Sequence, residues 1–170
     1  AGLSTTFRGD PGQLDLKADS QSEVKFQADL TGKFDITNVI PRFLLESYSA
    51  LLQIEGRTDW LVSLTVGEDE LDGDLGPILN VTSGLEGVVL KLPAPLNKRS
   101  DENWPLVLRY PLSDLGSTLD VELVDGVTLR FNLSGADGTP QSAVVYIGSD
   151  IPELPPRGFV RIEGACEQLD

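Results

Sequence analysis

The chain has 170 residues, 40% of them hydrophobic and 24% charged, a composition typical of a folded protein of one domain or of a slice of a longer one. Its net charge of −14 argues against binding to nucleic acid or docking on an anionic lipid surface, because both need clustered lysine and arginine. The sequence has no histidine, which excludes Ser-His-Asp and Cys-His catalysis and histidine-based metal sites, and its single cysteine, Cys166, excludes an internal disulfide. It also lacks methionine, so we expect an internal fragment of a longer protein.

The N-terminal part alternates apolar and polar residues, which predicts β-strands. We expect strands near 3–8 and 13–19, and a clearer one in "EVKFQADL", where Phe26 and Leu30 alternate with polar neighbours. The cluster "RGDPG" separates the first two strands and favours a turn.

The next segment, "TNVIPRFLLESYSALL", breaks this alternation and carries apolar residues at helical spacing. Thr37 or Asn38 can cap a helix here, and Pro41 falls in its first turn, where proline is tolerated. We therefore predict one helix over about 39–52 in an otherwise β-sheet chain.

The remainder returns to alternation, with strands predicted near 53–66, 78–83, 85–92, 104–110, 141–148 and 157–164. The strongest local signal is "STLDVELVDGVTLRFNL", in which two alternating runs flank Asp125-Gly126. This dipeptide tolerates the positive φ of a tight turn, so the segment predicts a β-hairpin.

"LKLPAPLNK", from Leu90 to Lys98, is an unusual end to a strand. Pro93 and Pro95 cannot donate hydrogen bonds to a sheet, and their fixed φ makes "PAP" stiff and extended. We predict a rigid corner between two strands, placed where it can steer the rim of a groove.

This mainly β chain, with about ten strands of one apolar face each and one helix, has a large apolar area to be covered. The sheet can fold on itself as a β-sandwich or barrel with a closed core, which is the commoner solution. It can also remain one strongly curved antiparallel sheet, an open groove whose apolar face holds something else. The alternation by itself is compatible with both.

Three stretches together resemble the YhdP branch of the AsmA-like family of Gram-negative envelope proteins. "SGLEGVVLKLPAPLNKRSDENWPLVLRY" is similar to a strand followed by "LPAPLGK" and "PLPLRL" in that family, with Asn97 where glycine is usual. Upstream, "LLQIEGRTDWLVSLTV" resembles its "L-x-G-x-x-x-W" strand through Ile54, Gly56 and Trp60. Downstream, "IPELPPRGFVRIEGACEQLD" is similar to its "LP-x-x-G-x-x-hydrophobic-x-G" ending. The resemblance covers about residues 40–170.

This resemblance implies a segment, spanning all of residues 1–170, of a long periplasmic protein that is anchored in the inner membrane and built as an extended apolar β-groove. It implies phospholipid transfer to the outer membrane and maintenance of the outer-membrane barrier, with phospholipid acyl chains and neighbouring segments of the full-length protein as partners. Such a role needs no cofactor, metal or catalytic group, and exposed edge strands could pair two copies. The alternatives are an envelope scaffold that carries no lipid and an unrelated β-sandwich module that binds protein or sugar.

The candidate groove-lining residues are the apolar members of the alternating strands. They are Val24, Phe26, Leu30, Trp60, Val62, Leu64, Leu106, Leu108, Leu119, Val121, Val127, Leu129 and Phe131. Ordinary core packing is the alternative for each of them. We expect Trp60 and the helix residues Phe43, Leu44 and Tyr48 to plug the groove or cover one end.

Two acidic patterns invite other interpretations. "EDELDGDLG" could suggest a calcium loop, but counting from Asp69 puts Leu71 and Gly73 at positions that need oxygen ligands. Asp120 and Glu122 could suggest a glycosidase pair, but their spacing places both on the polar face of one strand. We interpret both patterns as solvated surface.

Overall fold

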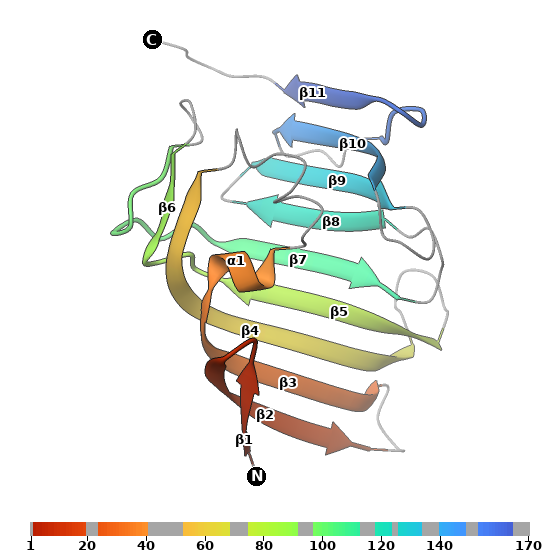
Figure 1. The fold of residues 1–170 in the computed structure, drawn as a ribbon. Helices are drawn as coiled ribbons and strands as arrows, with labels where there is room; N and C mark the ends of the chain where they lie inside the picture. Colours follow the sequence, from red (N-terminus) through yellow and green to blue (C-terminus); the bar gives the residue numbers. More distant parts are fainter. Residues whose placement is uncertain are drawn as a thin grey trace.

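The computed structural model describes residues 2–19, 24–40, 53–68, 75–91, 97–112, 118–123, 126–133, 140–148 and 153–164. All strands in these ranges belong to one 11-stranded sheet, which is open and does not close into a barrel (Figure 1). The prediction of a single sheet with a short helix is confirmed, and the alternative of two packed sheets is wrong.

The strands are β1 (Leu3–Phe7), β2 (Asp10–Ala18), β3 (Val24–Asp35), β4 (Ile54–Glu68), β5 (Leu75–Ser83), β6 (Val88–Leu90), β7 (Leu106–Pro111), β8 (Thr118–Leu123), β9 (Val127–Leu133), β10 (Pro140–Ile147) and β11 (Val160–Gly164). Their order in the sheet follows the chain, β1-β2-β3-β4-β5-β7-β8-β9-β10-β11, and only β6 leaves this path. Consecutive strands therefore lie side by side, as in a meander.

Two of the predicted strands differ in detail. The strand predicted at 85–92 is only β6, because Leu85 and Gly87 both have positive φ and turn the chain before Val88. The strand predicted at 157–164 begins at Val160 and pairs with β10 in parallel, whereas the other pairs are antiparallel. The sheet thus departs from the antiparallel expectation at its last strand.

The helix α1 spans Ile36–Val39, directly after β3. Its N-cap is Asp35, whose carboxylate accepts from the Thr37 N–H at 2.9 Å, so the prediction of Thr37 or Asn38 as the cap is wrong. Asp35 takes this position because β3 continues up to it and its side chain reaches the first turn. The rest of the predicted helix, 41–52, lies outside the described residues.

The first residue of β2, Asp10, anchors α1 through its carboxylate. Asp10 Oδ2 accepts from the Asp35 N–H at 3.0 Å and from Asn38 Nδ2 at 3.2 Å, while Oδ1 lies 2.6 Å from Arg57 Nη2. The Asp35 N–H, followed by the Arg57 guanidinium, lowers the pKa of Asp10. Three elements distant in sequence are joined at this carboxylate.

Strand β4 bends sharply near its start, as Figure 1 shows. Ile54–Gly56 pair with β6, whereas the following residues pair with β3 and β5. Gly56 has φ +127, and a Cβ atom there would clash with the Gly87 carbonyl oxygen. Only glycine permits this bend and the close approach of the two backbones.

Among the described residues, the buried hydrophobic side chains other than Val144 form two clusters on one face of the sheet. The larger cluster contains Phe34, Ile36, Trp60, Val81, Leu85, Val88 and Leu90. The smaller one contains Leu119, Phe131, Leu133 and Ala143. The helix α1 and strand β6 contribute to the larger cluster, so they cover one end of this face.

A candidate apolar groove

One cross-strand row of apolar side chains passes through ten strands. Each member lies opposite the next in register, and register partners share a face of the sheet. The row, which we call the apolar row, is Leu3, Leu14, Leu30, Val62, Val81, Leu108, Val121, Leu129, Val145 and Ile162. At about 4.8 Å between strands it extends over about 43 Å.

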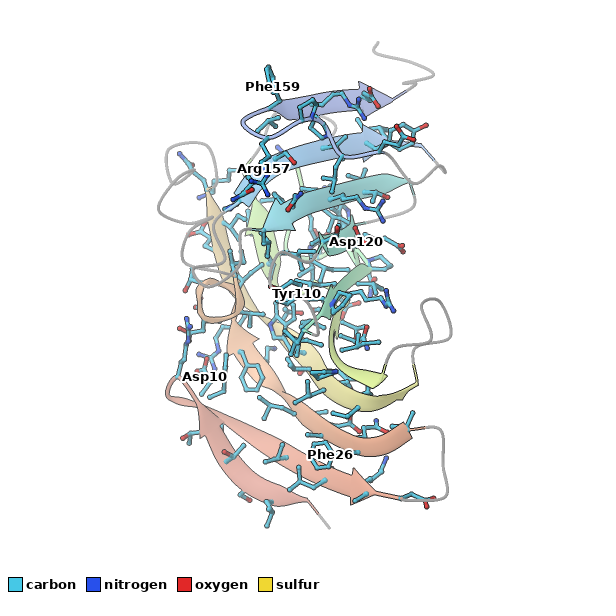
Figure 2. The ribbon with its side chains drawn as sticks, turned by 90° about the vertical axis from the view of Figure 1, so that its right-hand side faces the viewer. Asp10, Phe26, Tyr110, Asp120, Arg157 and Phe159 are labelled. Carbon is cyan, nitrogen blue, oxygen red and sulfur yellow. The ribbon has the colours of Figure 1, made fainter. Side chains whose placement is uncertain are left out.

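The neighbouring rows on the same face are also mainly apolar. One contains Ala28, Leu64, Leu79 and Tyr110, and another contains Trp60, Leu106, Leu123 and Val127. We call this side of the sheet the apolar face. In Figure 2 the labelled side chains of Phe26 and Tyr110 lie on the inner side of the curved sheet.

The structure brings twelve of the thirteen predicted lining residues onto the apolar face. The exception is Val24, because the register of β3 shifts between Val24 and Phe26 and leaves Val24 opposite Gly67. Phe26, by contrast, lies opposite Val66. A local bulge of this kind leaves no mark in the alternation of "EVKFQADL".

Protein side chains fill one end of the apolar face. Trp60 is 4% exposed, and its Nε1 donates to the Phe34 carbonyl at 3.3 Å. The Phe34 ring lies over the paired glycines Gly12 and Gly32, where a Cβ on Gly32 would come within 2.5 Å of it. Phe7 packs on the same ring at 5.2 Å between centroids. Trp60 is therefore a core residue. The packed side chains of Phe34 and Trp60 close this end of the apolar face, and we call them the plug.

Toward the opposite ends of strands β2–β4, the apolar face carries side chains that belong to neither of the two clusters of described residues. These are Leu16, Phe26, Ala28 and Leu64, which we call the groove patch. Leu16 is 52% exposed, and the other three are half-buried. The groove patch is therefore a part of the apolar face that neither cluster of the described residues uses.

The described residues on either side of the predicted corner, Leu90 and Lys98, are paired, and Lys98 is buried. Leu90 and Lys98 exchange two backbone hydrogen bonds of 3.0 Å, and Lys98 Nζ donates to the carbonyls of Val88 at 3.0 Å and Arg99 at 2.9 Å. The residue is 0% exposed, and burial lowers the pKa of its amine. Pro93 and Pro95 lie outside the described residues. The lysine thus has a structural role that the sequence motif did not indicate.

The opposite, outer face carries a polar counterpart to the apolar row. The register aligns Asp15, Asp29, Ser63, Asn80, Arg109, Asp120, Arg130, Val144 and Arg161, which we call the polar row. Its one apolar member, Val144, is buried. Each member is adjacent in sequence to a member of the apolar row. Asp120 and Glu122, which we interpreted as polar surface residues and not as a glycosidase pair, both lie on this outer face, where Asp120 forms an ion pair with Arg130.

Two contacts stabilise charges within the polar row. Arg130 Nε and Nη2 donate to the two carboxylate oxygens of Asp120 at 2.6 and 3.0 Å, which raises the pKa of Arg130. Asp29 accepts from the Ser63 hydroxyl and from Gln27 Nε2, at 2.8 Å for its Oδ2. The Ser63 bond is the main cause of the lowered pKa of Asp29. These contacts hold the strands in register.

The outer face also contains a shallow depression of about 510 Å³. It is lined across four strands by the register partners Thr31, Leu61, Thr82 and Val107, with Asp59 at one side. Leu61 is 40% and Val107 43% exposed. This depression was not predicted from the sequence, since isolated apolar residues at polar positions of an alternating strand are common.

The described residues define a class of protein: an open β-sheet that is apolar on one face, polar on the other, and plugged at one end. Within those residues, no helix is long and apolar enough to cross a bilayer, and no group of three or more acidic or cysteine side chains is placed to hold a metal ion. The acidic segment 69–74 lies outside them. Comparisons with protein-family models, with curated proteins and with solved structures give no match.

Proposed function

We propose that this chain is a segment of a periplasmic envelope protein that shields phospholipid acyl chains on an apolar β-groove during their transfer to the outer membrane. The observation that carries the proposal is the apolar row, which continues across ten strands of a sheet without a second sheet packed on it in the part of the chain that the structure describes. The resemblance to the YhdP branch of the AsmA-like family supports the periplasmic setting and the lipid.

Energetics explain why such a face suits this ligand. A phospholipid has about 30 methylene groups, and each costs about 0.8 kcal/mol when exposed to water. Carrying the chains through water unshielded would therefore cost more than about 20 kcal/mol. A continuous apolar surface removes this cost without a specific pocket, and the polar row on the other face keeps the sheet hydrated.

The groove patch is where we expect acyl chains to bind. Phe26 and Leu64 are half-buried but belong to neither core cluster of the described residues, whereas Trp60 and Phe34 are already packed. A ligand over β2–β4 would thus replace solvent and would leave the core intact.

The test compares two leucines of the same strand that face opposite sides. Leu64 is in the groove patch, and Leu61 lies on the outer face. Native mass spectrometry after incubation with phosphatidylethanolamine should show bound lipid on the wild type and on Leu61→Asp. Leu64→Asp should bind at least about tenfold more weakly, because burying one leucine side chain contributes about 1.5–3 kcal/mol.

Circular dichroism melting curves establish that both variants are folded. Equal lipid binding by folded Leu64→Asp and Leu61→Asp would contradict binding on the apolar face. A wild-type chain that binds no phospholipid would contradict the carrier role itself and favour the alternative of an envelope scaffold.

A further inference from the structure

The last of the described strands, β11, lies at one edge of the sheet and is rich in exposed apolar side chains. Phe159, Val160 and Ile162 are 63%, 62% and 76% exposed, the largest exposed fractions among the exposed large hydrophobic residues described. Among the described strands, β11 pairs only with β10. An exposed edge strand rich in apolar side chains favours association with another strand.

The backbone of β11 is oriented for such pairing. The Ala143 N–H donates to the Phe159 carbonyl at 3.2 Å, and Ala143 is the register partner of Val160. In a parallel ladder the flanking residues of each register partner make the bonds. Arg161 therefore directs its backbone groups toward β10, and Val160 and Ile162 direct theirs to the open edge.

We propose that two copies of this chain associate through antiparallel pairing of β11 with β11, centred on Ile162. In this register Ile162 lies opposite its counterpart, and Val160 lies opposite Gly164 of the second copy. Each of these positions has its N–H and carbonyl at the open edge, so both strands can donate and accept in turn. The apolar row then continues without interruption from one copy into the other.

Charge complementarity identifies the second copy as the partner. Arg161 and Glu163 occupy the outer face of β11, where Arg161 Nε lies 2.9 Å from Glu163 Oε1. Antiparallel pairing about Ile162 places Arg161 of each copy directly opposite Glu163 of the other, at the separation where opposite charges stabilise a sheet. The guanidinium has further N–H donors besides the one that binds the Glu153 carbonyl.

The other edge of the sheet lacks this pattern. Strand β1, Leu3–Phe7, contains no charged residue, so pairing of β1 with itself or with β11 forms no ion pair. Pairing of β11 with β1 of the next copy would also leave two free edges and give open-ended chains. Pairing of β11 with β11 is two-fold symmetric, so it gives a closed dimer. Formation of this dimer does not require bound lipid.

The experiment measures molar mass by size-exclusion chromatography with light scattering, at loading concentrations of about 10 to 300 µM, because a small interface gives a weak dimer. The wild type should approach the dimer mass as its concentration rises. Arg161→Glu alone and Glu163→Arg alone should each remain monomeric, since like charges then oppose each other across the two strands. An equimolar mixture of the two variants should form a heterodimer, and the double variant should again dimerise.

Leu3→Lys, on the other edge strand, is the matched control and should dimerise like the wild type, whereas Ile162→Lys should not. A wild type that stays monomeric up to about 300 µM, single charge variants that dimerise, or a mixture that fails to form the heterodimer would each overturn the proposal. Masses that grow beyond the dimer would overturn it too and would indicate pairing of β11 with β1 instead. Circular dichroism establishes that each variant is folded.

Discussion

The apolar row and the polar row are made from adjacent residues of the same strands, yet they have different roles. Leu30 and Asp29, or Leu129 and Arg130, differ by one position and lie on opposite faces of the sheet. The apolar row is exposed at its two ends, Leu3 and Ile162, buried at Val81 and half-buried elsewhere. The polar row supplies hydrogen bonds and ion pairs that cross from strand to strand.

This difference shows that the two faces meet different requirements of a one-layer sheet: the covering of apolar surface and the selection of one strand register. The apolar face needs cover, which Phe34 and Trp60 provide at one end and the smaller cluster around Leu119 and Phe131 provides over β8–β10. The outer face must favour a single strand register, because a slip of one residue would exchange all side chains between the faces. Pairs such as Asp120 with Arg130 penalise such a slip.

The largest effect is expected at the plug. Trp60→Ala should lower the free energy of unfolding by about 4 kcal/mol, because it leaves a cavity in the larger cluster and removes the hydrogen bond from Trp60 Nε1 to the Phe34 carbonyl. The matched change on the outer face, Leu61→Ala, should cost less than about 1 kcal/mol, since Leu61 is 40% exposed. Urea unfolding monitored by circular dichroism measures both. Similar losses for the two variants would contradict the contrast between the faces.

A smaller effect is expected in the polar row. Arg130→Met should lower the free energy of unfolding by about 1–2 kcal/mol, because the bidentate pair with Asp120 is only 24% and 29% exposed. Arg99→Met serves as the control, since Arg99 is 72% exposed in its ion pair with Asp101 and should contribute about 0–0.5 kcal/mol. If Arg99→Met cost as much as Arg130→Met, the register role of the polar row would be refuted.

The smallest effect is a pH dependence at Asp29. The pKa of this carboxyl is lowered in the folded protein, so folding is favoured by its ionised form. Its contribution is complete above the unfolded value of about 3.9 and is lost as the pH falls through the lower folded pKa. Melting temperatures of the wild type and Asp29→Asn should therefore differ at neutral pH and converge below about pH 4. A difference that persists unchanged at about pH 3 would assign the loss to the substitution's geometry.

Much of the fold could be predicted because the period-two alternation of a strand indicates which residues share a face. The runs around Phe26, Val121 and Phe131 lie where their alternation placed them. The register shift at Val24 and the short β6 were missed, because each depends on backbone contacts with a distant strand. The Asp35 cap was missed because β3 extends further than its apolar alternation.

The candidate site was predictable only as a set of residues. Which of them form a plug and which form the groove patch depends on glycines that make room for a ring, as at Gly32 beneath Phe34. Lys98 likewise appears in the sequence as an ordinary basic turn residue. Its burial against two carbonyls becomes evident only when Leu90 and Lys98 are paired.

By itself the sequence determined that this protein is a sheet with one apolar and one polar side, because side chains alternate along every strand whatever the partner. Only the tertiary structure decided that the sheet stays open in one layer, which end is plugged, and how the edges present their backbone groups. The physical reason is that these features arise from register and from contacts between strands remote in the chain. Such contacts leave no periodic pattern in the sequence of a single strand.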